Sequence, residues 1–242
     1  MNQALLFGLI SGFSLVAGAA IGIFFNIKRK TIAAFMAFGS GVLICALTFG
    51  LMEEAFKHGG FDAIIIGFLL GGIIFIAADY FIHILGGRGH RKHKFSQNTK
   101  SSGPAITIGT LLDGIPESIA LGIAIFNNQG VGILMLTAIV LSNFPEGISS
   151  ISGLRGEGMK KWQIIGMWLA VALVTMVIVV ASFVFLHDLD LNSIGILESF
   201  AAGAILAMLA DNMMPEAYEE GGYGVGIMTI LGFLTSFIIS RF

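Results

Sequence analysis

Three of the four prolines in this chain are followed directly by glutamate inside long apolar stretches. The pairs are Pro116-Glu117, Pro145-Glu146 and Pro215-Glu216. A charged side chain at the centre of a bilayer costs about 2.5–3.5 kcal/mol. A proline inside a helix also removes a backbone hydrogen bond. Three repeats of this costly pair predict a polar path for cations through a membrane.

Asp113 and Glu117 stand four residues apart in the first of these stretches. This spacing puts both carboxylates on one face of a helix. Pro116 clashes with the carbonyl group of Leu112, one turn earlier, and frees that oxygen to act as a further ligand.

The next apolar stretch carries Ser142, Asn143 and Glu146 around Pro145. If the two helices face each other, their oxygen-bearing side chains meet near the bilayer centre, and such sites suit divalent cations. The carboxylates of the two stretches have no Lys or Arg at membrane depth to pair with, so they need protons or a cation. For Ser142 and Asn143 the alternative stays open that they only hydrogen-bond the helices together.

Further carboxylates lie nearer the ends of apolar stretches. Asp211 and Glu216 are predicted exit ligands on the cytoplasmic side, and Glu53 and Glu54 are predicted entrance ligands on the outer side. Near a membrane–water interface a carboxylate costs little free energy, so each of these residues can equally be structural or solvated. His58 is expected on the outer surface, with no more than a weak attraction for cations.

The elements that must position these residues are membrane helices. Hydrophobic residues make up 56% of the chain and charged residues 12%, the mean hydropathy is +0.91, and a soluble domain has about 25% charged residues. A spanning helix needs about 20 mostly apolar residues. We therefore predict an all-α polytopic membrane protein with eight transmembrane helices. The predicted spans are 4–26, 31–56, 61–86, 105–127, 131–153, 163–186, 194–217 and 222–240.

The distribution of basic residues predicts the topology. Eleven of the thirteen Lys and Arg residues fall in the connections after the first, third and fifth predicted helices. The positive-inside rule places these connections in the cytoplasm and both termini outside. We expect the chain to form one transmembrane domain, 1–242, in which a polar cytoplasmic loop, 86–102, separates helices 1–3 (1–85) from helices 4–8 (103–242). His90 and His93 in this loop are candidates for metal capture, although histidines in a basic loop are usually solvated.

An internal repeat relates two distant segments. MEEAFKHGGF at 52–61 resembles MPEAYEEGGY at 214–223. At the same offset of 162 residues, Phe38 aligns with Phe200 and Gly41 aligns with Gly203. On the predicted topology the two copies have opposite orientations, so they form an inverted repeat of helices 1–3 against helices 6–8, with helices 4 and 5 central. A shorter repeat relates IPESI at 115–119 to FPEGI at 144–148.

Together these features resemble the ZIP (Zrt/Irt-like protein) family of divalent metal transporters. The matching stretches are DGIPES at 113–118, SNFPEG at 142–147 and DNMMPEAYEEGG at 211–222. The resemblance implies eight helices, both termini outside, a metal site built by proline-glutamate motifs on helices 4 and 5, and a homodimer. Glu117 and Glu146 carry over as ligands, and Asn143 is an acceptable one.

The chain departs from the family pattern where imidazoles are usual. The family's helix 4 motif usually begins with His-Asn, and Asp113 and Gly114 stand there; Ser142 stands where helix 5 commonly has His or Gln. Imidazole favours zinc, whereas carboxylate and carbonyl oxygens suit harder ions such as manganese. We therefore expect a divalent cation as substrate, with Zn, Mn, Fe, Co and Cd as candidates.

The leading functional prediction is transport of a divalent metal into the cytoplasm across a cell (inner or plasma) membrane. The alternatives are a non-transporting metal sensor or scaffold, and a proton or monovalent-cation carrier on the same fold. An intramembrane hydrolase is disfavoured, since HExxH, GxSxG and GxGD motifs are absent from the sequence. We expect no enzymatic activity, no cofactor and no nucleic-acid partner; the expected partners are lipid and metal ions.

Overall fold

The computed structural model describes residues 1–84, 103–127 and 129–240, and the regular structure in these ranges is helical. The α-helices are α1 (Asn2–Phe24), α2 (Arg29–Ala46), α3 (Glu53–Ile84), α4 (Gly103–Asn127), α5 (Gln129–Gly156), α6 (Lys161–Phe185), α7 (Leu191–Met208), α8 (Met214–Gly221) and α9 (Val225–Ile239). Two π-helical segments follow α2 and α7, namely η1 (Leu47–Met52) and η3 (Leu209–Met213). Six helical stretches of the described residues are long and apolar enough to cross a membrane. The prediction of an all-α membrane protein is thus confirmed.

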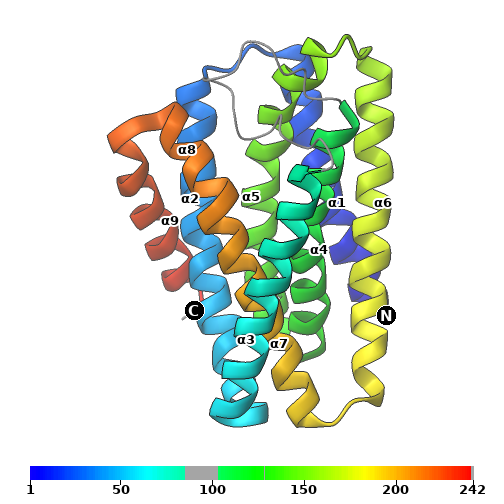
Figure 1. The fold of residues 1–242 in the computed structure, drawn as a ribbon, viewed down its shortest axis with the longest axis vertical. Coiled ribbons are helices and arrows are strands. Elements are labelled where there is room, and N and C mark those ends of the chain that lie inside the picture. The colour runs from blue at the N-terminus through cyan, green and yellow to red at the C-terminus, as the bar shows by residue number, and fades with distance from the viewer. Residues whose placement is uncertain (85–102, 128, 241–242) are drawn as a thin grey trace.

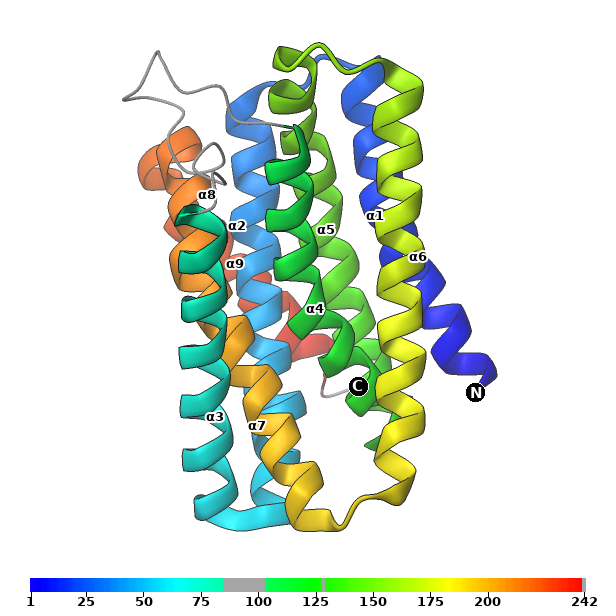
Figure 2. The same ribbon diagram turned by 45° about the vertical axis from the view of Figure 1, so that its right-hand side comes forward.

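Two of these six stretches are too long for a single crossing. Arg29–Ile82 contains 54 residues and Leu191–Ile239 contains 49, whereas about 20 residues span the hydrocarbon core. Each contains a glycine in the left-handed region, Gly60 with φ 65° and Gly222 with φ 67°, a conformation that glycine adopts without strain. The chain reverses direction after α2 and again after α8 (Figures 1 and 2).

The helices pack in two groups that run side by side (Figures 1 and 2). In the first group, α1 packs against α5 and α6, and α4 contacts the same two helices. In the second group, α3 packs along α7, and α2 packs against α8 and α9. Contacts of α2 with α5, and of α4 with α7, join the groups. Residues from both sides of this junction build the site described below.

Glycines bring helices of the second group into close contact. A Cβ atom on Gly41 of α2 would collide with the carbonyl oxygen of Thr229 in α9, and one on Gly232 would collide with that of Phe38. Small residues at such positions allow the backbones of membrane helices to approach closely.

Replacing Gly41 by alanine is therefore expected to lower the free energy of unfolding by about 1–3 kcal/mol, since the added methyl group forces α2 and α9 apart. Gly226→Ala is the matched control, because nothing lies within 4 Å of the added Cβ. Thermal unfolding of the purified protein in detergent measures both. Equal midpoints for the two variants would contradict this account of the interface.

The prolines do not share one structural role. Pro116 and Pro145 lie inside the continuous helices α4 and α5. Pro215 instead lies in the first turn of α8, directly after η3, where the π-helical segment already interrupts the regular α-helical hydrogen bonding. Pro116 and Leu112 line a small apolar hollow of about 100 Å³ between α3, α4 and α7.

Candidate metal site

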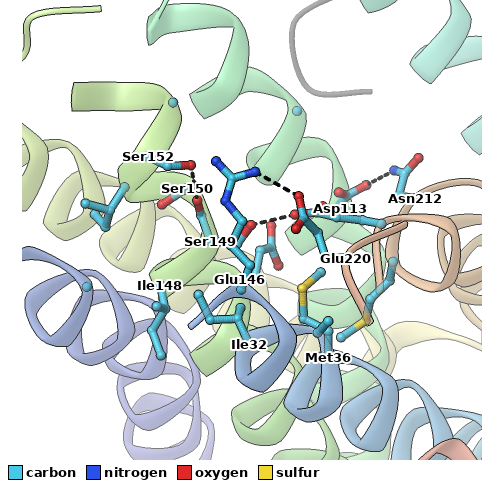
Figure 3. Close-up of a pocket in the computed structure, with 18 of the residues that line it drawn as sticks. Ile32, Met36, Asp113, Glu146, Ile148, Ser149, Ser150, Ser152, Asn212 and Glu220 are labelled. Carbon is cyan, nitrogen blue, oxygen red and sulfur yellow. Dashed lines mark hydrogen bonds and ion pairs between the residues drawn. The ribbon is translucent and has the colours of Figure 1, made fainter. Parts of the chain in front are cut away.

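A cavity of about 540 Å³ lies between the two helix groups. It extends from the end of the molecule that carries the α1–α2 and α5–α6 connections, which we call the mouth, to side chains deep in α4 and α5. Eight carboxylates line it, namely Asp79, Asp113, Glu117, Glu146, Asp211, Glu216, Glu219 and Glu220. Figure 3 shows Asp113, Glu146 and Glu220 around this space.

Helix α4 supplies Asp113 and Glu117, which both line the cavity as their four-residue spacing predicts. Glu117 is 4% exposed and accepts a hydrogen bond of 3.2 Å from the Ser142 hydroxyl of α5. Asp113 accepts a bond of 2.7 Å from the Nδ2 of Asn212 in η3 (Figure 3). The two acids of α4 are therefore held from opposite sides, one by each helix group.

Helix α5 supplies Glu146, whose Oε1 atom is buried without a hydrogen-bond partner among the described residues. An unpaired buried carboxylate oxygen is costly and calls for a proton or a cation. Ser142 contacts Glu117, but Asn143 points elsewhere, since its Nδ2 lies 3.4 Å from the carbonyl oxygen of Ser11 in α1. Neither Ser142 nor Asn143 is among the residues that line the cavity.

The second helix group supplies Asp211 and Glu216. Asp211 lies in the π-helical segment η3, and such segments often occur at functional sites. Glu216 in α8 accepts a hydrogen bond of 2.5 Å from the Ser149 hydroxyl of α5. This bond and the Asp113–Asn212 bond both cross the junction between the groups.

The cavity is a lined passage and not a closed cage. Within the part of the chain that the structure describes, no three His, Cys, Asp or Glu side chains stand close enough together to hold one metal ion. Serine and asparagine partners hold several carboxylates in place, as at Glu117, Asp113 and Glu216. A cation in this cavity would first meet scattered carboxylate oxygens, which suit hard divalent ions.

Basic side chains line the cavity only near its mouth, as far as the described residues go. Arg29 pairs with Glu220 at 3.0 Å, and Arg155 donates to the carbonyl oxygen of Ile23. Both arginines thus have partners at the mouth, while the carboxylates deeper inside keep their attraction for cations. The predicted capture of metal by His90 and His93 falls outside the described residues.

At the end of the molecule opposite the mouth, two carboxylates are engaged by a neighbouring lysine. Lys57 pairs with Glu54 at 2.8 Å and with Glu53 at 3.4 Å. At the start of α7, hydrogen bonds from Ser193 lower the pKa of Asp190. Asp190 thus caps α7, and Glu53 and Glu54 form ion pairs with Lys57, while their predicted role as entrance ligands stays a prediction.

His58 differs from the sequence-based expectation of a surface residue. Its side chain is only 20% exposed, because its Nδ1 lies 3.0 Å from the carboxylate of Glu198 in α7. Glu198 itself is 0% exposed. Sequence reasoning missed Glu198, although a glutamate in the apolar run from Ile194 to Met208 is a signal that could have found it.

The fold and the cavity together define a class, a multi-pass α-helical membrane protein with a carboxylate-lined cavity. Comparison with known proteins narrows this class. The sequence profile of the ZIP zinc transporter family matches residues 102–240, more than half of the chain. The chain therefore belongs to the ZIP family. It is also 24% identical over 217 residues to a putative zinc transporter of Arabidopsis thaliana. That alignment covers 86% of this chain, which spans about a third (34%) of the length of the plant protein.

Proposed function

We propose that this protein transports divalent metal ions into the cytoplasm, by a path through the acidic cavity. The observation that carries the proposal is the cavity itself, where carboxylates from α4, α5, η3 and α8 converge between two helix groups. Glu117 and Glu146 at its inner end are the proposed binding ligands, and Asp113 on the same face of α4 is a further carboxylate that a passing cation would meet. Asp211 and Glu216 lead from there towards the mouth.

We further propose eight membrane crossings, with α2 and α3 as separate crossings and α7–α8 and α9 as two more. Support comes from the turns at Gly60 and Gly222, which divide the two overlong stretches. The eight crossings would place the basic connections at the mouth in the cytoplasm and both termini outside. The cavity would then be open to the cytoplasm and closed to the outside.

We also propose that the chain contains an inverted repeat, because several features recur at an offset of 162 residues. Helices α2 and α7 each contain 18 residues, begin 162 positions apart and lead into π-helical segments. Gly60 and Gly222, again 162 positions apart, have nearly equal φ angles of 65° and 67°. The close contacts correspond as well. A Cβ on Gly41 would meet α9, and one on its counterpart Gly203 would meet Phe68 of α3.

Transporters built from inverted repeats commonly work by movement of one repeat or helix bundle against the other. This movement opens the binding site to each side of the membrane in turn. Among the described residues, the side-chain hydrogen bonds across the junction are few and local, such as Asp113–Asn212 and Ser149–Glu216. Relative movement of the two helix groups would break few such bonds. We propose that this movement carries the cation from one side to the other, and that the protein acts as a homodimer.

Metal uptake into proteoliposomes tests the proposal. Mn, Fe, Zn, Co and Cd are offered separately to vesicles with the native chain and to protein-free vesicles. We expect saturable uptake of at least one of these ions, together with competition among them. Absence of flux for every metal, from protein that unfolds cooperatively on heating, would overturn the proposal. Proton flux without metal would favour a proton carrier.

A further inference from the structure

The end of the molecule opposite the mouth contains a buried polar cluster that the metal path does not use. Its centre is Glu198, 0% exposed and seven residues into α7, which is about 10 Å along the helix. A carboxylate at this depth is costly unless donors surround it.

Glu198 has donors from two other helices. The Nδ1 of His58, near the start of α3, lies 3.0 Å from Oε2 and 3.1 Å from Oε1. The Nδ2 of Asn127, the last residue of α4, donates to Oε1. One carboxylate thus joins α3, α4 and α7.

The two bonds differ in what they connect. His58 and Glu198 both belong to the second helix group, in which α3 and α7 pack along each other. Asn127 belongs to the first group, and α4 meets α7 over a much smaller interface. The bond from Asn127 to Glu198 is therefore a polar tie between the two groups at this end, and hydrogen bonds to a charged group are among the stronger ones.

Apolar packing next to the tie is tight. Leu51 of η1 is 0% exposed, and η1 contacts α4, α5 and α7. Gly195, one turn before Glu198, faces the backbone of Ala55 and Gly59 so closely that an added Cβ would lie 2.9 Å from both. The cavity that opens at the mouth is not lined by residues of this end.

We propose that the bond from Asn127 to Glu198, with His58 holding the carboxylate in position, is a latch that keeps the outer end shut while the cavity faces the cytoplasm. The inference rests on the proposed transport function, because only a protein that opens to both sides needs such a latch. When the outer side opens, α4 and α7 separate and the latch bond breaks.

Cysteine accessibility in lipid nanodiscs tests the latch without any need for metal flux. Ser152→Cys places a reporter on the cavity wall, and Leu51→Cys places one at a buried position outside the cavity lining. The chain without added cysteine measures reaction at the buried Cys45. In the native background we expect a polar thiol reagent to modify position 152 quickly and position 51 slowly.

Asn127→Ala removes the tie between the groups and leaves Glu198 with His58. We expect modification at position 51 to become about tenfold faster, the equilibrium effect of losing one hydrogen bond to a charged group, and modification at position 152 to slow. Asn192→Ala is the matched control, since Asn192 is exposed at the same end and takes no part in the latch. Unchanged rates at both reporters in Asn127→Ala would overturn the latch.

A second variant guards against misfolding. Glu198→Gln keeps the shape of the side chain but makes its hydrogen bonds neutral. We therefore expect a smaller increase in the modification rate at position 51 than in Asn127→Ala. This variant tests the latch if Asn127→Ala fails to fold. Faster modification of position 51 in a chain that moves no metal would support the latch and contradict the transport proposal. Metal flux in a protein whose modification rates at positions 51 and 152 do not change in the variants would support the transport proposal and contradict the latch.

Discussion

Replacement of Glu117 and Glu146 by alanine together is expected to reduce metal uptake at least about a hundredfold. The two carboxylates come from neighbouring helices and line the inner end of the cavity, where Glu117 is buried and the Oε1 of Glu146 lacks a partner among the described residues. Loss of a group that merely orients a metal ligand commonly costs 10–100-fold, so loss of two ligands costs at least as much. Uptake into proteoliposomes at equal protein density measures the effect.

The same double variant is expected to unfold at a higher temperature than the native chain when metal is absent. Removal of buried carboxylates that lack a compensating charge relieves a desolvation cost, and functional sites commonly trade stability for activity. Asp62→Ala with Glu157→Ala is the matched control, because it removes two exposed carboxylates outside the cavity lining and should leave uptake unchanged. Native-like uptake by the Glu117/Glu146 variant would remove these residues from the metal path.

Replacement of Asp113 by histidine is expected to shift the preference of the transporter towards zinc by roughly tenfold relative to manganese. Imidazole is a favoured zinc ligand, while carboxylate oxygens suit harder ions. Asp113 lines the cavity on the same face of α4 as Glu117, so a side chain at this position reaches the same space. Uptake of zinc and of manganese, each measured in competition with the other, gives the ratio.

Asp113→Asn is the control for this prediction. It removes the charge but keeps an oxygen able to accept from Asn212, so we expect uptake of every metal to fall while their ranking stays the same. A ranking that does not change in the histidine variant would mean that position 113 does not contact the cation, and selectivity would then lie with other ligands.

Much of the fold could be predicted because the bilayer restricts the possibilities. Long apolar stretches must be helical in lipid, and the sequence shows them directly. The spacing of Asp113 and Glu117 also predicted their common face, since a helix repeats every 3.6 residues. The turns between helices were placed approximately, since the predicted spans end at 56 and 217 and resume at 61 and 222. The chain turns at Gly60 and Gly222, and their positive φ angles, which Gly158 shares, are known only from the structure.

The candidate site was only partly predictable, because local spacing does not determine what faces what across helices. Ser142 and Asn143 are adjacent in sequence, but Ser142 bonds to Glu117 and Asn143 to the backbone of α1. The sequence predicted a site between helices 4 and 5 with Asp211 and Glu216 as exit ligands. It did not predict that Asp79, Glu219 and Glu220 line the same cavity. Glu198 escaped notice because its partners, His58 and Asn127, lie 140 and 71 residues away in the sequence.

The sequence by itself determined the membrane class, the helices and the acidic character of the path, since hydropathy, helical period and the cost of charge in lipid act on neighbouring residues. Only the tertiary structure decided which carboxylates share a cavity, at which end of the molecule that cavity opens, and which buried glutamate ties the helix groups together. Those features depend on side chains from distant segments meeting at hydrogen-bond distance. Packing between helices, and not any local pattern, brings them there.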